Sequence, residues 1–293
     1  MKLLGDMDKS VYYFREQQYD KALGLLADSI DQIKFIIEAI IKDRDYFNLV
    51  ATESMLEMMT GILEAKKNRD LVLLADLLEL QLINFLIGVQ ELIISKEEIL
   101  FNEDNYKENI NLLLEAHVGF PGELKEPINT TKLLESGYRV EFTSCGQMTL
   151  AAENAGFTFY FHTNSKVQTE AFLIARHWYQ KEKERYIVYG FGMGYHINEL
   201  QSMAKNADLE IYEADLNVIQ LACAFADVRE LLLKPRIKII YDPQLEQLKA
   251  RITSLESNEK LVIHYPSYIN IKNKNGKKLL RGYLPWSKAI EEC

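Results

Sequence analysis

Cysteine is scarce in this chain of 293 residues, which contains three. Cys145, Cys223 and Cys293 are far apart, odd in number and outside any CxxC motif, which argues against a disulfide framework and against a zinc knuckle. The five histidines also lack the short spacing of metal-binding motifs, so we expect no metal site. This cysteine usage is typical of a reduced, cytoplasmic protein, and we expect that location.

The chain also lacks basic charge and long apolar runs. It has 34 Lys and Arg against 43 Asp and Glu, a net charge of -9. Because binding to a phosphate backbone requires a basic surface, we expect no nucleic-acid partner. The longest stretch without a charged residue is about 13 residues, short of the roughly 20 that a membrane span needs. We therefore expect no membrane span, and the acidic start Met1–Asp6 is unlike a secretory signal.

Proline and glycine are rare in the first part of the chain. All six prolines lie after residue 120, and only four of the fourteen glycines lie before residue 118. In a helix interior proline costs about 3 kcal/mol and glycine about 1 kcal/mol, so this composition permits long helices. The same part carries most of the excess acidic charge. We predict a helical bundle domain at 1–118, a linker at 119–134 and an α/β domain at 135–293.

Apolar residues in the first domain recur every three or four positions, as in an amphipathic helix. One such stripe consists of Leu23, Leu26, Ile30, Ile33, Ile37 and Ile41. Residues 71–94 are apolar nearly all round, which is typical of a central helix of a bundle or of an interface helix. We therefore expect a homodimer or a protein partner that binds through this domain, with burial inside a single bundle as the alternative.

Short β-branched and aromatic runs alternate with helical patterns in the second domain. The predicted strands are 138–144, 157–162, 186–190, 209–213, 237–241 and 261–265. Strands at this spacing with helices between them indicate right-handed crossovers and a mostly parallel sheet. The predicted fold class is α/β: an all-α N-terminal domain followed by a Rossmann-like, mostly parallel sheet with flanking helices.

The stretch Tyr186–His196 reads Tyr-Ile-Val-Tyr-Gly-Phe-Gly-Met-Gly-Tyr-His. It predicts a buried strand, a glycine-rich turn and a helix start. Three glycines in five residues allow a sharp turn and let a ligand approach the backbone, while the helix N-terminus adds free N–H groups. A turn without a ligand is the alternative. The residues of this turn that we expect to contact a ligand are Gly190, Phe191, Gly192, Gly194, Tyr195 and His196.

Other candidate site residues lie at or just after the ends of further predicted strands. Glu213 lies 23 residues after Gly190, where an acidic side chain accepts hydrogen bonds from a ribose diol. Asp242 follows the predicted strand at 237–241, where class I methyltransferases, which the glycine turn resembles, often have an acid that contacts adenine; a helix cap is the alternative. We expect substrate-side contacts, or alternatively structural turns and helix caps, from His162, Thr163, His264 and Tyr265. Together these residues predict a nucleotide-like small-molecule ligand.

Four segments resemble the N-terminal Rossmann-like part of the motility accessory factor family: Tyr160–Thr163, Thr169–Ala171, Gly190–Ile197 and Ile211–Leu216. The resemblance spans about residues 135–270 and omits the helical domain. It implies a ligand-binding fold and a role near the transfer of nonulosonic sugars to flagellin. In that family the transfer itself is attributed to a further domain, so the resemblance leaves enzymatic activity open.

The GxGxG spacing of the turn is also similar to the first motif of class I S-adenosylmethionine methyltransferases. That similarity implies S-adenosylmethionine as the ligand, whereas the motility resemblance implies a nucleotide of the CMP-sugar kind. Three functions therefore stay open. They are a ligand-binding module that supports flagellin glycosylation, a methyltransferase, and an interaction protein whose Rossmann domain binds no ligand.

Overall fold

The computed structural model describes residues 2–97, 103–117, 119–125, 135–154, 157–226 and 228–284. The chain forms two compact units. The helical unit consists of Met1–Leu100 with two short segments, Phe142–Gln147 and Ser165–Thr169. The α/β unit consists of the remainder. Most of the predicted linker at 119–134 lies outside the described residues.

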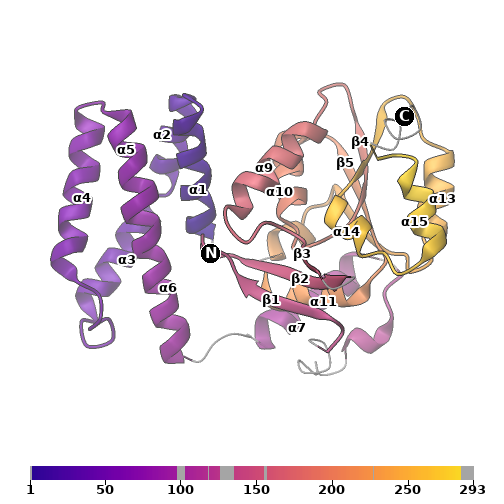
Figure 1. Cartoon of the computed structure of the whole chain (residues 1–293), viewed down its shortest axis with the longest axis horizontal. Helices are drawn as coiled ribbons and strands as arrows, with labels where there is room; N and C mark the ends of the chain where they lie inside the picture. The colour runs from indigo at the N-terminus through magenta and orange to yellow at the C-terminus, as the bar shows by residue number, and fades with distance from the viewer. Residues whose placement is uncertain are drawn as a thin grey trace. The chain divides into compact units, whose positions relative to one another are not determined.

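The helical unit is built from consecutive helices, as predicted (Figure 1). They are α1 (Lys2–Arg15), α2 (Tyr19–Asp28), α3 (Ile30–Lys42), α4 (Thr52–Lys67), α5 (Leu71–Leu77), η1 (Leu78–Leu82) and α6 (Ile83–Glu97). Asp70 begins the α5–η1–α6 run, because its side chain accepts a hydrogen bond of 2.9 Å from the N–H of Leu73. Core side chains that are almost fully buried include Met7, Ile40, Met55, Leu74, Leu78 and Leu82.

The continuous helical run Leu71–Lys96 is long and apolar enough to cross a membrane by length and composition, with a mean hydropathy of 1.9. Leu74, Leu78 and Leu82 of this run nevertheless lie in the core of the helical unit. A central helix of a bundle has this composition because it is surrounded by other helices. The run therefore has the character that its sequence predicted for a core or interface helix.

The α/β unit contains a parallel sheet of four strands in the order β6-β5-β4-β7. The strands are β4 (Arg185–Tyr189), β5 (Asp208–Glu213), β6 (Ile237–Tyr241) and β7 (Glu259–Ile263). β4 lies between β5 and β7, with Ile187 opposite both Glu210 and Leu261. Because β7 returns to the free side of β4, the strand order reverses there. This order confirms the predicted Rossmann-like fold and puts its switch point between β4 and β7.

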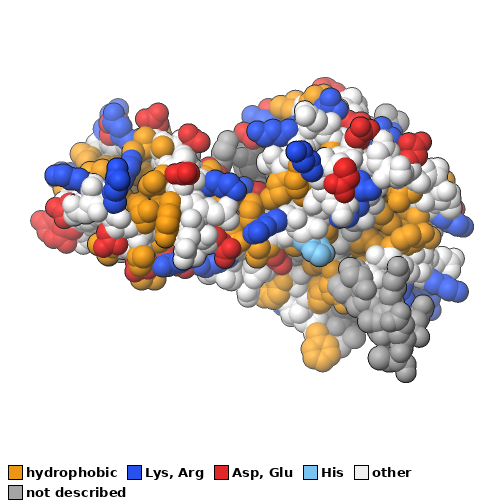
Figure 2. Space-filling view, turned by 90° about the horizontal axis from the view of Figure 1, so that it is seen from above, with side chains coloured by type: hydrophobic (Ala, Val, Ile, Leu, Met, Phe, Trp, Pro, Cys, Tyr) orange, Lys and Arg blue, Asp and Glu red, His pale blue; other side chains and the backbone are white. Residues whose placement is uncertain are grey.

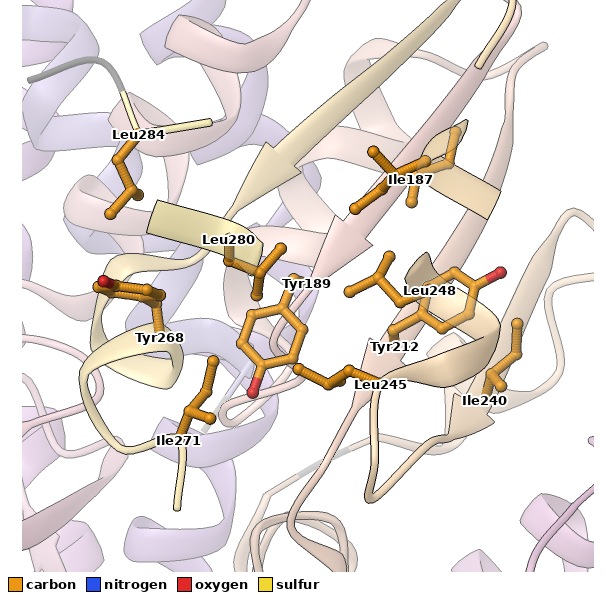
Figure 3. Packing of buried hydrophobic residues seen from close by; sticks show 11 residues of the cluster. Ile187, Tyr189, Tyr212, Ile240, Leu245, Leu248, Tyr268, Ile271, Leu280 and Leu284 are labelled. Atoms are coloured by element: carbon orange, nitrogen blue, oxygen red, sulfur yellow. The ribbon is translucent and has the colours of Figure 1, made fainter. Parts of the chain in front are cut away.

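Helices cover both faces of this sheet. Figure 1 shows α9 (Val167–Trp178) and α10 (Tyr195–Met203) on one side of β4 and β5. On the other side lie α13 (Glu246–Thr253), α14 (Tyr265–Ile269) and α15 (Lys274–Arg281). Figure 3 shows how the second layer packs. In that layer Tyr189 and Tyr212 of the sheet meet Leu245, Leu248 and Leu280 of the helical layer.

A second sheet has the order β1-β2-β3 and consists of β1 (Tyr138–Phe142), β2 (Met148–Asn154) and β3 (Phe157–Tyr160). β2 and β3 are antiparallel. The sequence predicted β1 and β3 but not β2. Strand β2 is buried on both faces, so it lacks the alternation of apolar and polar residues that marks a half-exposed strand. Its buried residues are Met148, Thr149, Leu150, Ala151 and Ala152.

The remaining helices among the described residues are η2 (Gly122–Lys125), α11 (Leu216–Phe225), α12 (Arg229–Leu232) and α7 (Glu103–Ala116). α7 belongs to the α/β unit, although the predicted boundary at residue 118 groups it with the helical domain. Its Asn109 amide donates a hydrogen bond of 2.9 Å to the carbonyl of Cys223 in α11. The amphipathic pattern predicted this helix but could not show which core it covers.

Candidate functional site

The glycine-rich turn after β4 requires glycine at three positions. Gly190, Gly192 and Gly194 have φ angles of +102°, +53° and +81°, a region that L side chains rarely adopt. A Cβ on Gly190 would lie 2.4 Å from the Cβ of Ser267 and 2.9 Å from that of His264. Glycine therefore allows the chain after β7 to approach the turn closely. Gly194 begins α10 as its N-cap residue.

The carboxylate of Glu213, at the end of β5, accepts hydrogen bonds from backbone N–H groups of the glycine turn and of the two residues that follow Glu213. One carboxylate oxygen accepts from the N–H of Phe191 in the glycine turn at 2.9 Å. The other accepts from the N–H groups of Ala214 and Asp215 at 2.8 and 2.9 Å. Burial raises the pKa of Glu213 to about 7, although these N–H groups favour the charged form. Of the four lone pairs on a carboxylate, three are used, which leaves one acceptor site for a ligand.

A cavity of about 190 Å³ opens beside Glu213 at the carboxyl ends of β5 and β6. Its polar lining includes Asp215, which accepts hydrogen bonds of 2.8 Å from the Tyr138 hydroxyl and 2.9 Å from Asn217. The ammonium group of Lys272 lies 2.9 Å from the Asp215 carboxylate. Burial raises the pKa of Asp215, but Lys272 and Tyr138 together hold it below its ordinary value. The aromatic lining residues are Tyr138, Phe161, Tyr189 and Tyr241.

Of the predicted cofactor residues, Glu213 lines this cavity directly. Phe191 contributes its backbone N–H to Glu213, as described above. Tyr195 points elsewhere, since its hydroxyl donates to the carbonyl of Met148 at 2.9 Å. The Asp242 carboxylate accepts from the N–H groups of Glu246 and Leu248 at 3.2 and 2.9 Å, so it acts as the helix cap that the sequence offered as an alternative.

Two of the predicted substrate-side residues make structural contacts. The backbone N–H of Thr163 donates to the Glu170 carboxylate at 2.6 Å. The ring of Tyr265 packs against those of Phe159 and Tyr268, with centroid distances of 6.2 and 6.1 Å. Thr163 lies in the irregular segment after β3, and Tyr265 is the first residue of α14, which follows β7. These contacts correspond to the structural alternative, and neither side chain lines the cavity beside Glu213.

The other two substrate-side candidates, His162 and His264, form a buried cluster with His196. The ring centroids of His196 and His264 are 4.1 Å apart with nearly parallel planes, and His162 lies 4.9 Å from His264 and 5.3 Å from His196. Burial and a neighbouring imidazole hold the pKa of His196 well below its ordinary value, and the same causes act on His264. All three are at most 1% exposed.

This histidine cluster lies at the carboxyl ends of three strands. His162 follows β3, His196 follows β4 through the glycine turn, and His264 follows β7 directly. His162 and His196 are 34 positions apart, and His196 and His264 are 68 positions apart. No local spacing in the sequence therefore indicated that the three form one cluster. The signal available in the sequence was that each lies at or just after the end of a predicted strand, at the edge of the fold where α/β domains bind ligands.

Comparisons with known proteins give a partial result. Residues 2–92 match a family described as "Domain of unknown function (DUF8042)", a match confined to the helical unit. No curated protein matches the chain. Among solved structures, the crystal structure of MnmC2 from Aquifex aeolicus is similar at 17% identity, with 60% of each chain covered and a TM-score of 0.26. This chain thus spans less than two thirds of that protein, and the fold assignment rests on the observed strand order.

Proposed function

We propose that the α/β unit binds a nucleotide-like small molecule in the cavity beside Glu213. The observation that carries the proposal is the composition of this cavity, which combines acidic, cationic and aromatic groups at the carboxyl ends of β5 and β6. Open α/β sheets bind ligands outside the carboxyl ends of their strands, and the cavity lies at that edge.

Each chemical part of such a ligand has a matching group. The free lone pair of Glu213 accepts a hydrogen bond from one ribose hydroxyl. The rings of Tyr138 and Tyr241 offer apolar faces for a base. The ammonium group of Lys272, which is 69% exposed, can pair with a phosphate or a carboxylate. S-adenosylmethionine and CMP-linked sugars both contain a ribose, a base and an anionic group, so both fit this description.

The two family resemblances of the glycine turn favour different ligands. Similarity to motility accessory factors favours a CMP-type ligand and a role in flagellin glycosylation. Similarity to methyltransferases favours S-adenosylmethionine, and the strand order β6-β5-β4-β7, with an acidic residue after β5, supports that second candidate. Methyl transfer needs little beyond a cofactor and an acceptor held in the right orientation, so no further catalytic group is required of this chain.

Calorimetry on the full chain distinguishes the candidates. Titration with S-adenosylhomocysteine, CMP and a nucleotide sugar is expected to give saturable binding of one molecule per chain for one of these classes. In the variant Lys272→Met the affinity is expected to fall about tenfold, the loss of one charge-assisted contact of about 1.4 kcal/mol. The matched control is Lys278→Met, an exposed lysine of α15 that does not line the cavity.

Each outcome of these titrations supports or contradicts the proposal. No binding by any of the three would contradict it and would favour an interaction protein without a ligand. An equal loss of affinity in Lys272→Met and Lys278→Met would place the ligand elsewhere. Conversion of S-adenosylmethionine to S-adenosylhomocysteine by the wild-type chain would make the methyltransferase the leading function.

We also propose that a second copy of this chain binds through the helical unit. Hydrophobic side chains interrupt its charged surface, as the left-hand part of Figure 2 shows. Exposed ones include Phe35, Leu56, Leu63, Val72 and Leu80. A dimer interface resembles a domain core cut in half and would cover such side chains. Light scattering is expected to give about 68 kDa, twice the chain mass of 34.0 kDa. A mass of 34 kDa at micromolar concentration would contradict this prediction.

A further inference from the structure

The three buried histidines at the switch point leave ring nitrogens without partners. Among the described residues, neither nitrogen of His162, nor Nδ1 of His196, nor Nε2 of His264 has a hydrogen-bond partner. A buried polar atom without a partner costs about 1–3 kcal/mol, so several in one cluster call for an explanation. Each ring therefore has at least one nitrogen available as a ligand atom. One nitrogen from each of the three rings lies within 4.8 Å of one nitrogen from each of the others.

The opposite nitrogens of the three rings have neighbours that orient them. His196 Nε2 lies 3.1 Å from the carbonyl oxygen of Gly190, and His264 Nδ1 lies 2.8 Å from the Ser267 hydroxyl. His162 Nδ1 lies 3.8 Å from the Glu170 carboxylate. Histidines that bind a metal usually donate their second N–H to a carbonyl, a carboxylate or another oxygen, which fixes the tautomer and frees the other nitrogen. The rings of His196 and His264 follow this arrangement, while Nδ1 of His162 lies near the Glu170 carboxylate but beyond hydrogen-bond distance.

From this geometry we infer that His162, His196 and His264 bind a divalent transition-metal ion of the kind that prefers imidazole ligands, with Zn²⁺ as the ion to test. Three histidines plus one open position is a known coordination of zinc in catalytic sites. The rings meet at Gly192, where a Cβ would lie 3.1 Å from His162 Nε2 and 3.3 Å from His264 Cε1. Glycine at this position keeps a side chain out of the cluster.

Binding requires a limited movement of the rings. Zn–N bonds are about 2.0–2.1 Å long, so nitrogens in a tetrahedral site are about 3.4 Å apart. The nearly parallel planes of His196 and His264 must tilt so that both nitrogens point at one ion. Oxygen-preferring Mg²⁺ is not expected to bind this set of ligands.

The metal site would adjoin the cavity of the proposed function. Ser267 lines that cavity and contacts His264, and Phe161 of the lining precedes His162 in the chain. The open coordination position could therefore take water or a group of a molecule in the cavity. The inference itself does not depend on nucleotide binding, because it rests on the histidine geometry alone.

The test uses the full chain, stripped with a chelator and then titrated with Zn²⁺ or Mg²⁺ in the absence of any nucleotide. We expect one Zn²⁺ per chain and no competition by Mg²⁺. His264→Gln is expected to weaken Zn²⁺ binding at least tenfold, and Ser267→Ala about tenfold, the usual loss when a group that orients a ligand is removed. The control His177→Ala, an exposed histidine of α9, is expected to leave the affinity unchanged.

Two results would overturn the inference. One is a wild-type chain that does not bind Zn²⁺ at one per chain, and the other is equal affinity in His264→Gln and His177→Ala. Should His264→Gln fail to fold, X-ray absorption on the zinc-loaded wild-type chain decides the question. Three imidazole nitrogens at about 2.0–2.1 Å support the site, and a shell of oxygen or sulfur ligands contradicts it.

Discussion

Replacing Gly190 by alanine is expected to lower the free energy of unfolding of the α/β unit by about 3–5 kcal/mol. The new Cβ would lie 2.4 Å from Ser267 Cβ, an atom fixed to the backbone of α14. The φ angle of +102° adds strain for any residue with a Cβ. Urea unfolding followed by tryptophan fluorescence measures this, since Trp178 lies in the α/β unit.

Gly282→Ala is the matched control in the same unit. Gly282 has a φ of -65°, and a Cβ there has no heavy atom within 4 Å, so a change of no more than about 0.5 kcal/mol is expected. A loss in Gly190→Ala as small as in this control would mean that the chain after β7 does not pack against the turn. The close approach of Ser267 in α14 to Gly190 would then be wrong.

The second large effect is expected at Glu213. Glu213→Ala leaves the N–H groups of Phe191, Ala214 and Asp215 without their acceptor. A buried unpaired N–H costs about 1–3 kcal/mol; that of Phe191 is buried and those of Ala214 and Asp215 are half-buried, so we expect a loss of about 3 kcal/mol. The same unfolding measurement applies.

Two further variants test whether the loss of stability comes from the missing acceptor. Glu213→Gln keeps one acceptor oxygen and is expected to lose about half as much stability as Glu213→Ala. Glu182→Ala removes an exposed carboxylate and is expected to change stability by no more than about 0.5 kcal/mol. If Glu213→Ala were as stable as Glu182→Ala, Glu213 would not hold the glycine turn, and its carboxylate would be fully available to a ligand.

Sequence patterns predicted which strands form better than they predicted where each strand begins and ends. The strands predicted at 186–190, 209–213 and 237–241 appear as β4, β5 and β6 within one residue at each end. β7 begins two residues earlier than predicted, because it starts with the charged pair Glu259 and Lys260. Glu259 is buried there by its pairing with Arg185 and Arg251, long-range contacts that no local pattern shows.

The segment after β7 is a second case in which the local sequence pattern did not indicate the structure. The lysine-rich run around residue 276 lacks an obvious apolar stripe, yet it forms α15. Gly276 allows that helix to pack closely, since a Cβ there would lie 2.4 Å from a side-chain carbon of Leu245. A glycine that reads as a turn in the sequence is thus a packing requirement in the structure.

The site was predictable where it depends on strand ends and not where it depends on side-chain direction. Glu213 lies beside the cavity, as its place after β5 predicted. Asp242 has an equivalent place after β6, but its carboxylate turns to cap α13. Lys272 reaches the cavity from the segment between α14 and α15, where no predicted strand ends to mark it as a site residue. Which of two equivalent acids faces a ligand is decided by the following turn, and that depends on tertiary packing.

Hydrogen exchange measures whether a nucleotide-like ligand binds beside Glu213. Amide exchange of the full chain is measured alone and with a saturating amount of whichever of S-adenosylhomocysteine, CMP or nucleotide sugar binds. We expect slower exchange in the segments 213–218 and 241–243, which line the cavity. Unchanged exchange in both segments, with protection only in the helical unit, would contradict it.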